Sequence, residues 1–176
     1  LIMTKLTNET YIQEVADKIK ASTKTQEPGE YGRQNDQPGK HGTSHVSVVD
    51  ADGNTVSITS TINNRFGSRR RSESLGIIWN DEMDDFSIPG AKNFYGFEPA
   101  KANFMAPGKR PMSSMSPVII YDKSSGDVKA SVGASGGSKI ISALAQFMLF
   151  NVNFNATVKE AIDFPRIHNQ FTPINT

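Results

Sequence analysis

Apolar and polar residues follow two different periods along the chain, and these periods predict where helices and strands lie. Apolar residues recur every three or four positions after Asn8, which predicts a helix over residues 8–22 that Asn8 caps. Apolar and polar residues then alternate over residues 45–50 and 55–61 on either side of Asp52-Gly53. This alternation predicts a β-hairpin with an Asp-Gly turn.

The second half of the chain continues with strands and then helices. The apolar run Leu75–Trp79 predicts a strand, and Pro117–Tyr121 with Val128–Val132 predicts a second hairpin. Predicted helices run from Ser138 to about Phe150 and from Thr157, as the capping residue, to Ile162. Two hairpins followed by helices predict an α+β fold built in layers.

Two polar segments interrupt this pattern. Residues 23–42 have almost no apolar content, which predicts an exposed and mobile loop. Residues 87–112 are rich in Pro, Gly, Lys and Asn, and a loop of that length within a compact domain is usually functional or disordered.

The composition narrows the class of protein. The chain has 176 residues, enough for one domain with a core, and its net charge of +1 gives no reason to expect nucleic acid as a partner. The absence of cysteine excludes disulfides and thiol catalysis. Two glycosylation sequons begin at Asn8 and Asn155, and the chain starts without methionine, so we expect a fragment of a longer, secreted protein.

Thr43 stands at the change from the polar tract to the first alternating segment. A threonine hydroxyl is a poor nucleophile unless a base lies beside it. Cleavage of the chain before Thr43 would supply that base, because a new α-amino group titrates near pH ~7.7–8.0. Without further context, the simpler interpretation is favoured, in which Thr43 is a β-branched residue that opens a strand.

Three other segments could carry chemistry, and each has a simpler structural interpretation. Four carboxylates lie within residues 81–85. They indicate either a solvated acidic loop or a site for a metal, a basic side chain or a ligand ammonium. Ser113-Ser114 forms a serine-rich turn or binds a carboxylate. The segment Gly133–Gly137 is a tight turn or presents backbone amides to an oxyanion. The three histidines form no metal-binding pattern, and no dinucleotide or Walker motif is present, so neither a metal nor a cofactor is expected.

Taken in order, these segments resemble the gamma-glutamyltransferase (gamma-glutamyl transpeptidase) family of N-terminal-nucleophile hydrolases. The resemblance runs from Gly42 to Gln170. The segments that carry it are Gly42–Val49, Thr59–Asn63, Phe66–Ser68, Asn80–Phe86, Pro107–Pro117, Gly133–Gly137 and Pro165–Gln170.

The resemblance implies a fold and a site. The fold would be part of a four-layer α/β/β/α sandwich, with residues 1–42 ending a large subunit and 43–176 forming most of a small one. Autoproteolysis at Gly42-Thr43 would make Thr43 the nucleophile, and Thr61 would support that cleavage. The oxyanion hole would comprise Gly136 and Gly137. The donor ammonium would bind Asn63, Glu82 and Asp85, and the donor carboxylate would bind Ser113 and Ser114.

The same resemblance implies what the protein acts on. The donor would be glutathione or another gamma-glutamyl compound, and the acceptor would be water, an amino acid or a dipeptide. The enzyme would be extracellular or at the cell surface, and the remainder of the large subunit would be its partner. Ser116 departs from the cysteine of several animal relatives, and a family arginine for the donor carboxylate would lie before residue 1. An acylase relative with another donor, and an inactive secreted homologue that acts as a binding module, remain alternatives.

Overall fold

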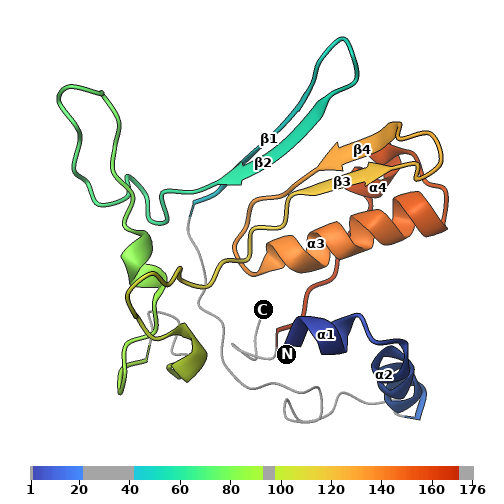
Figure 1. Ribbon diagram of the computed structural model, residues 1–176, viewed down its shortest axis with the longest axis horizontal. Coiled ribbons are helices and arrows are strands. Elements are labelled where there is room, and N and C mark those ends of the chain that lie inside the picture. Colours follow the sequence, from blue (N-terminus) through green and yellow to red (C-terminus); the bar gives the residue numbers. More distant parts are fainter. Residues whose placement is uncertain (1, 22–41, 93–97, 171–176) are drawn as a thin grey trace. The chain divides into compact units, whose positions relative to one another are not determined.

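The computed structural model describes residues 2–21, 42–92 and 98–170, which fall into two compact units, Leu1–Gln34 and Asn35–Thr176 (Figure 1). The predicted mobile loop of residues 23–42 lies outside the described residues, except for Gly42. Among the described helices, none combines the length and the apolar character that crossing a bilayer requires.

The first unit holds two helices, α1 (Ile2–Leu6) and α2 (Glu9–Ala21). The sequence pattern predicted α2 and its cap but not α1. The Asn8 side-chain oxygen accepts a hydrogen bond from the Tyr11 backbone N–H at 3.0 Å. This bond satisfies one of the amide groups that the first turn of a helix leaves without a partner, so the predicted cap is confirmed.

The first predicted hairpin is confirmed as the antiparallel pair β1 (Ser44–Val49) and β2 (Thr55–Ser60). The Asp50 carboxylate closes the turn, because it accepts bonds from the Asp52 N–H at 2.9 Å and the Asn54 N–H at 2.8 Å. A further bond from the Asn54 side chain is the main reason that the pKa of Asp50 lies below its ordinary value.

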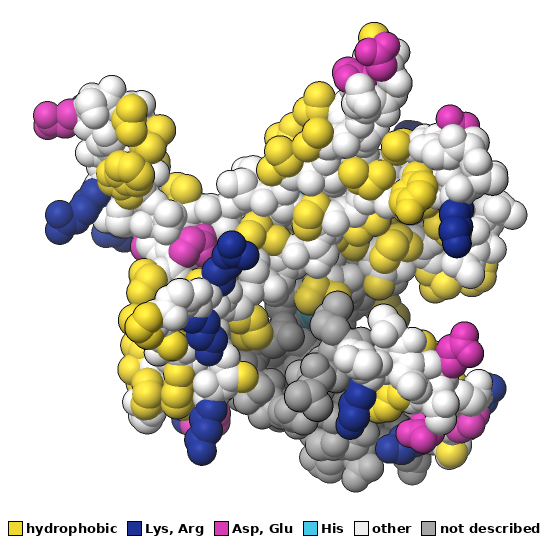
Figure 2. All heavy atoms as spheres, viewed as in Figure 1, with side chains coloured by type: hydrophobic (Ala, Val, Ile, Leu, Met, Phe, Trp, Pro, Cys, Tyr) yellow, Lys and Arg dark blue, Asp and Glu magenta, His cyan; other side chains and the backbone are white. Residues whose placement is uncertain are grey.

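A second antiparallel pair, β3 (Val118–Tyr121) and β4 (Val128–Val132), confirms the other predicted hairpin. The two hairpins are separate two-stranded sheets joined by serine side chains. The Ser47 hydroxyl donates to the Ser131 carbonyl at 3.0 Å, and the Ser57 hydroxyl donates to the Val132 carbonyl at 3.2 Å. Figure 2 shows hydrophobic side chains gathered along the β1–β2 hairpin, where Val46 is opposite Ile58.

The helices that follow the strands supply most of the buried core. Helix α3 (Lys139–Met148) buries Ile140, Leu144 and Phe147, which share one face at helical spacing. It continues into the π-helical turn η4 (Leu149–Asn153), and then α4 (Val158–Asp163) begins. Thr157 and Glu160 form a capping box at the start of α4, as the capping signal predicted.

The predicted strand Leu75–Trp79 is wrong. The segment is an exposed loop in which the single β-bridge pairs Ile78 with Arg71. The Ser72 hydroxyl accepts from the Leu75 N–H at 3.2 Å, and the Ser72 carbonyl accepts from the Gly76 N–H at 3.0 Å. The chain therefore reverses where an extended strand was expected. Only the end of the run pairs with a neighbouring segment, through bonds from the Ser72 N–H to the Ile77 carbonyl at 2.8 Å and from the Trp79 N–H to the Arg70 carbonyl at 2.9 Å.

The fold class is α+β, as the order of elements predicted. Within the described residues the sheets are two-stranded, and a four-layer sandwich is not seen. Two short 3-10 helices, η2 (Glu82–Asp85) and η3 (Lys101–Asn103), occupy the long segment between the hairpins. Both lie in the region to which the sequence assigned loops and substrate contacts.

Candidate active site

The peptide bond between Gly42 and Thr43 lies directly before β1. Thr43 is half-buried, and within the described part of the chain its hydroxyl oxygen is buried without a hydrogen-bond partner. The Thr61 hydroxyl, just beyond the end of β2, donates a hydrogen bond to the Gly42 carbonyl oxygen. The pairing of β1 with β2 thus brings a hydroxyl donor to the carbonyl that a Thr43 nucleophile would attack.

The Thr61 hydroxyl also holds the backbone of Asn63 in place. The Thr61 hydroxyl oxygen accepts a bond from the Asn63 backbone N–H at 2.8 Å. Asn63 is buried and has a φ of 68°, in the left-handed region that Asn enters more readily than most residues. This conformation turns the chain from the end of β2 toward the acidic segment.

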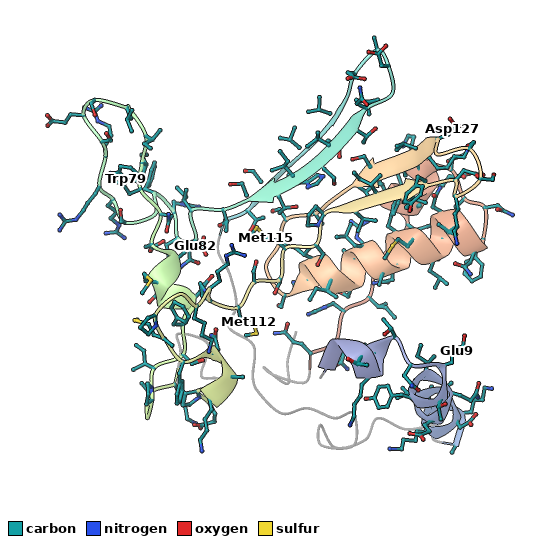
Figure 3. All side chains as sticks on the ribbon, viewed as in Figure 1. Glu9, Trp79, Glu82, Met112, Met115 and Asp127 are labelled. Carbon is teal, nitrogen blue, oxygen red and sulfur yellow. The ribbon has the colours of Figure 1, made fainter. Side chains whose placement is uncertain are left out.

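Hydrogen bonds to Asp81 connect the acidic segment to this turn. The Asn63 side-chain amide donates to the Asp81 carbonyl at 3.3 Å. The Asp81 carboxylate accepts from the Asn64 backbone N–H at 3.0 Å and from the Asn64 side-chain amide at 2.7 Å. Helix η2 begins at the next residue, Glu82, which is half-buried (Figure 3). The same helix carries Asp85, which is only 4% exposed. Asn63 is therefore bonded to the residue directly before the helix that carries Glu82 and Asp85, the other two residues that the resemblance assigned to an ammonium group.

The serine pair joins this cluster through a residue to which the sequence assigned no role. Ser114 is buried and Ser113 is exposed. The Asn103 side-chain amide donates to the Asp85 carbonyl at 2.7 Å, and its oxygen accepts from the Met112 N–H at 2.9 Å. Figure 3 shows Met112 and Met115 on the segment that contains the serines.

The glycine segment before α3 meets β1 at Gly133. A Cβ atom built on Gly133 would lie 2.0 Å from the Nδ1 atom of His45, so the imidazole ring lies directly against the glycine backbone. The same nitrogen is 2.8 Å from the Thr59 hydroxyl oxygen. Gly136 and Gly137 have φ values of 127° and 60°, and only glycine adopts the first of these without large strain.

A cavity of about 500 Å³ lies beside this segment. Its walls include His45 and Gly136 at one side and the apolar side chains of Leu144, Phe147 and Ile162 from the helices. Among the described residues, no group of three or more His, Asp and Glu side chains is placed to hold a metal ion.

The structure does not link every predicted site residue to Thr43. Among residues 42–92 and 98–170, no hydrogen bond joins Thr43 to the serine pair or to Gly136 and Gly137. Sequence reasoning missed Asn103 and the positioning contacts of Asp81 and His45. Asp81 and His45 belonged to recognised motifs, whereas Asn103 lies in a long loop where no sequence signal distinguishes it.

These observations define an α+β protein whose candidate site includes a threonine that follows a glycine at the head of a strand. The chain belongs to the Gamma-glutamyltranspeptidase family, whose sequence model matches residues 1–176.

Similar proteins include a scoloptoxin and a protein that is named as a putative inactive enzyme. Scoloptoxin SSD14 of Scolopendra dehaani is 47% identical over 98% of this chain and 29% of its own length. "Putative inactive glutathione hydrolase 4" of Arabidopsis thaliana is 43% identical over 98% of this chain and 90% of its own length. The chain thus spans less than a third of the first relative.

Solved structures give the same family. A mutant gamma-glutamyltranspeptidase of Helicobacter pylori superimposes with a TM-score of 0.64 and 43% sequence identity, covering 73% of this chain and 68% of that one. At this level of identity, the likeness extends from the fold to the sequence.

Proposed function

We propose that the full-length protein hydrolyses or transfers gamma-glutamyl groups from glutathione-like donors through a threonine acyl-enzyme. The observation that carries this proposal is the environment of the Gly42-Thr43 bond. The Thr43 hydroxyl is buried with no hydrogen-bond partner among the described residues, and the Thr61 hydroxyl donates to the Gly42 carbonyl. A buried hydroxyl without a partner is costly in a folded protein, which favours a chemical role for it.

Self-cleavage would proceed by attack of the Thr43 hydroxyl oxygen on the Gly42 carbonyl carbon. The C–O bond forms, the C–N bond breaks, and the hydroxyl proton passes to the departing nitrogen. Thr61 would stabilise the negative charge that develops on the Gly42 oxygen, as a hydrogen-bond donor aimed at that atom. Water then hydrolyses the ester and leaves Thr43 with a free α-amino group.

That amino group would be the general base for turnover. The Thr43 hydroxyl would attack the donor's γ-carbonyl carbon, the amine product would leave with a proton, and water or an acceptor amine would release the glutamyl group. The amides of Gly136 and Gly137 would hold the oxyanion, since both glycines lie in the turn before α3.

The donor's head group is an α-amino acid, with an ammonium and a carboxylate on one carbon. Asn63, Glu82 and Asp85 would bind the ammonium. The burial of Asp85 supports this assignment, because water would compete little with the ion pair there. Ser113 and Ser114 would bind the carboxylate.

The finer architecture is part of the same proposal. The four-layer sandwich would be completed by the remainder of a large subunit, and the enzyme would act outside the cell or at its surface. The two sequons are the sequence feature that supports this location.

N-terminal sequencing of the mature protein tests the proposal. The wild-type protein should yield a subunit beginning at Thr43, and Thr43→Ala should remain a single chain. Thr43→Ser retains a hydroxyl nucleophile and is the matched control, which should still cleave. Turnover of gamma-glutamyl donors by a protein whose mature chain begins elsewhere would contradict the mechanism.

A second candidate is an inactive homologue that acts as a binding module. The Arabidopsis thaliana relative favours it, because a protein named as inactive matches this chain over 90% of its length. A folded full-length protein that neither cleaves at Gly42-Thr43 nor turns over any gamma-glutamyl donor would establish this alternative. Turnover of a different acyl amide, with gamma-glutamyl donors untouched, would instead indicate an acylase.

A further inference from the structure

Asn103, in the long segment between the two hairpins, makes hydrogen bonds with both its side chain and its backbone. It ends η3 and is 5% exposed. Its side-chain amide donates to the Asp85 carbonyl at 2.7 Å and its side-chain oxygen accepts from the Met112 N–H at 2.9 Å. The side-chain nitrogen and oxygen of Asn103 are therefore bonded to the backbone of Asp85 and of Met112, which are far apart in the sequence.

The backbone of Asn103 is held as firmly as its side chain. The Asn103 N–H donates to the Ala100 carbonyl at 2.9 Å, and its carbonyl accepts from the Ser87 N–H at 3.0 Å. The side-chain amide nitrogen of Asn103 also lies 3.4 Å from the Ser87 hydroxyl oxygen. Because its backbone and its side chain are both hydrogen-bonded, Asn103 can fix the distance between the segments at Asp85 and Met112.

The two segments that Asn103 joins are the two halves of the proposed donor site. Asp85 ends the helix that carries the carboxylates for the donor ammonium, and Met112 directly precedes Ser113 and Ser114. Since the donor's ammonium and carboxylate share one carbon atom, a site that engages both must hold its two halves at a fixed separation. A misplacement of about 1 Å can cost as much as a hundredfold in rate.

We propose that Asn103 is a positioning residue that fixes the spacing between the ammonium-binding and carboxylate-binding segments. It would thereby select donors that carry a complete α-amino acid head group. This inference rests on the proposed function. Asn103 acts through the backbone of Asp85 and Met112 and does not itself touch the donor.

Two substitutions separate the contacts of the carboxamide. Asn103→Asp keeps an oxygen for the Met112 N–H but replaces the donor to the Asp85 carbonyl with a second acceptor. Asn103→Leu has a similar shape and removes both bonds. Asn151→Asp is the matched control, because the Asn151 side-chain amide, in η4, also donates to a backbone carbonyl, that of Ala156 at 2.9 Å.

The experiment measures kcat and KM of the full-length, processed variants with three acyl donors. One donor is gamma-glutamyl, one is glutaryl, which lacks the α-amino group, and one is 4-aminobutanoyl, which lacks the α-carboxylate. For Asn103→Asp we expect kcat/KM to fall roughly 10- to 100-fold with the gamma-glutamyl donor, mainly through KM. The two truncated donors should lose much less, because a donor held at one end does not report the spacing.

Each other outcome counts against the inference. An equal loss with all three donors, or no loss with the gamma-glutamyl donor, would show that Asn103 does not set the spacing. If Asn103→Leu fails to fold, Asn103→Asp decides. If neither variant folds while Asn151→Asp does, the role of Asn103 is structural and the inference is wrong. A folded wild-type protein without gamma-glutamyl turnover overturns the proposed function, and this inference with it.

Discussion

Replacing Thr61 with valine tests the proposed cleavage chemistry most directly. Valine has nearly the same shape as threonine but lacks the hydroxyl. The hydroxyl makes two bonds, since it donates to the Gly42 carbonyl and accepts from the Asn63 N–H at 2.8 Å. The substitution therefore removes one interaction proposed to act in the transition state for cleavage and one that acts in the folded state.

The two losses have different expected sizes and are measured differently. Loss of one donor to a developing oxyanion costs about 10²–10³ in rate, which corresponds to roughly 2.7–4 kcal/mol. Loss of the acceptor leaves the N–H of the buried Asn63 without its partner, which costs about 1–3 kcal/mol of stability. We therefore expect Thr61→Val to fold with reduced stability and to cleave at Gly42-Thr43 more than a hundred times more slowly.

Gel electrophoresis of the full-length precursor over time gives the cleavage rate, and denaturant unfolding of the uncleaved chain gives the stability. Thr61→Ser is the control, because it keeps the hydroxyl and should cleave within a few-fold of wild type. A Thr61→Val precursor that loses stability but cleaves at the wild-type rate would refute the role assigned to the Gly42 contact.

Three further predictions concern the rest of the described chain. Asp85→Asn keeps the shape of the side chain but removes its charge, so it should cleave normally and raise KM for gamma-glutamyl donors about tenfold or more, with an unchanged KM arguing against an ammonium contact. Gly133→Ala places a methyl group against the His45 ring and should destabilise the fold by about 1–3 kcal/mol in denaturant unfolding. The cost should shrink in a His45→Ala background, and an equal cost in both would exclude the clash. Hydrogen bonds from Thr157, chiefly from its backbone N–H, lower the pKa of the Glu160 carboxyl below its ordinary value of 4.5 in the folded state. The stability that the ionised carboxylate contributes is therefore complete above pH 4.5 and is lost as the pH falls through the lower pKa of the folded state. Unfolding measured at neutral pH and at about pH 3 should show that Glu160→Gln loses this part of the pH dependence, whereas a profile identical to wild type would show that the capping carboxylate does not contribute.

Local signals in the sequence were enough to determine several elements. The two hairpins follow from period-two alternation around turns, and the Asp50 carboxylate that closes the first turn lies within five residues of its partners. The caps at Asn8 and Thr157 are equally local. Each of these structures depends on atoms that are neighbours in the sequence, so their pattern can be read without knowing the fold.

Contacts between distant segments were decided only by the tertiary structure. The run Leu75–Trp79 has the composition of a strand, but a strand needs a neighbour along its whole length. The chain turns between Ser72 and Gly76, so only the end of the run pairs, with residues 68–72. The composition of the run carries no information about how far a neighbouring segment extends beside it.

The candidate site shows the same division. Sequence motifs and the family they resemble indicated Thr43, Thr61 and the acidic segment. The tertiary structure decided that Asn63 lies against Asp81, and that Asn103 joins Asp85 to the serine segment. A side-chain amide can bond to any backbone group that the fold brings near it, so the partners of Asn103 depend on the whole path of the chain and not on the residues beside it.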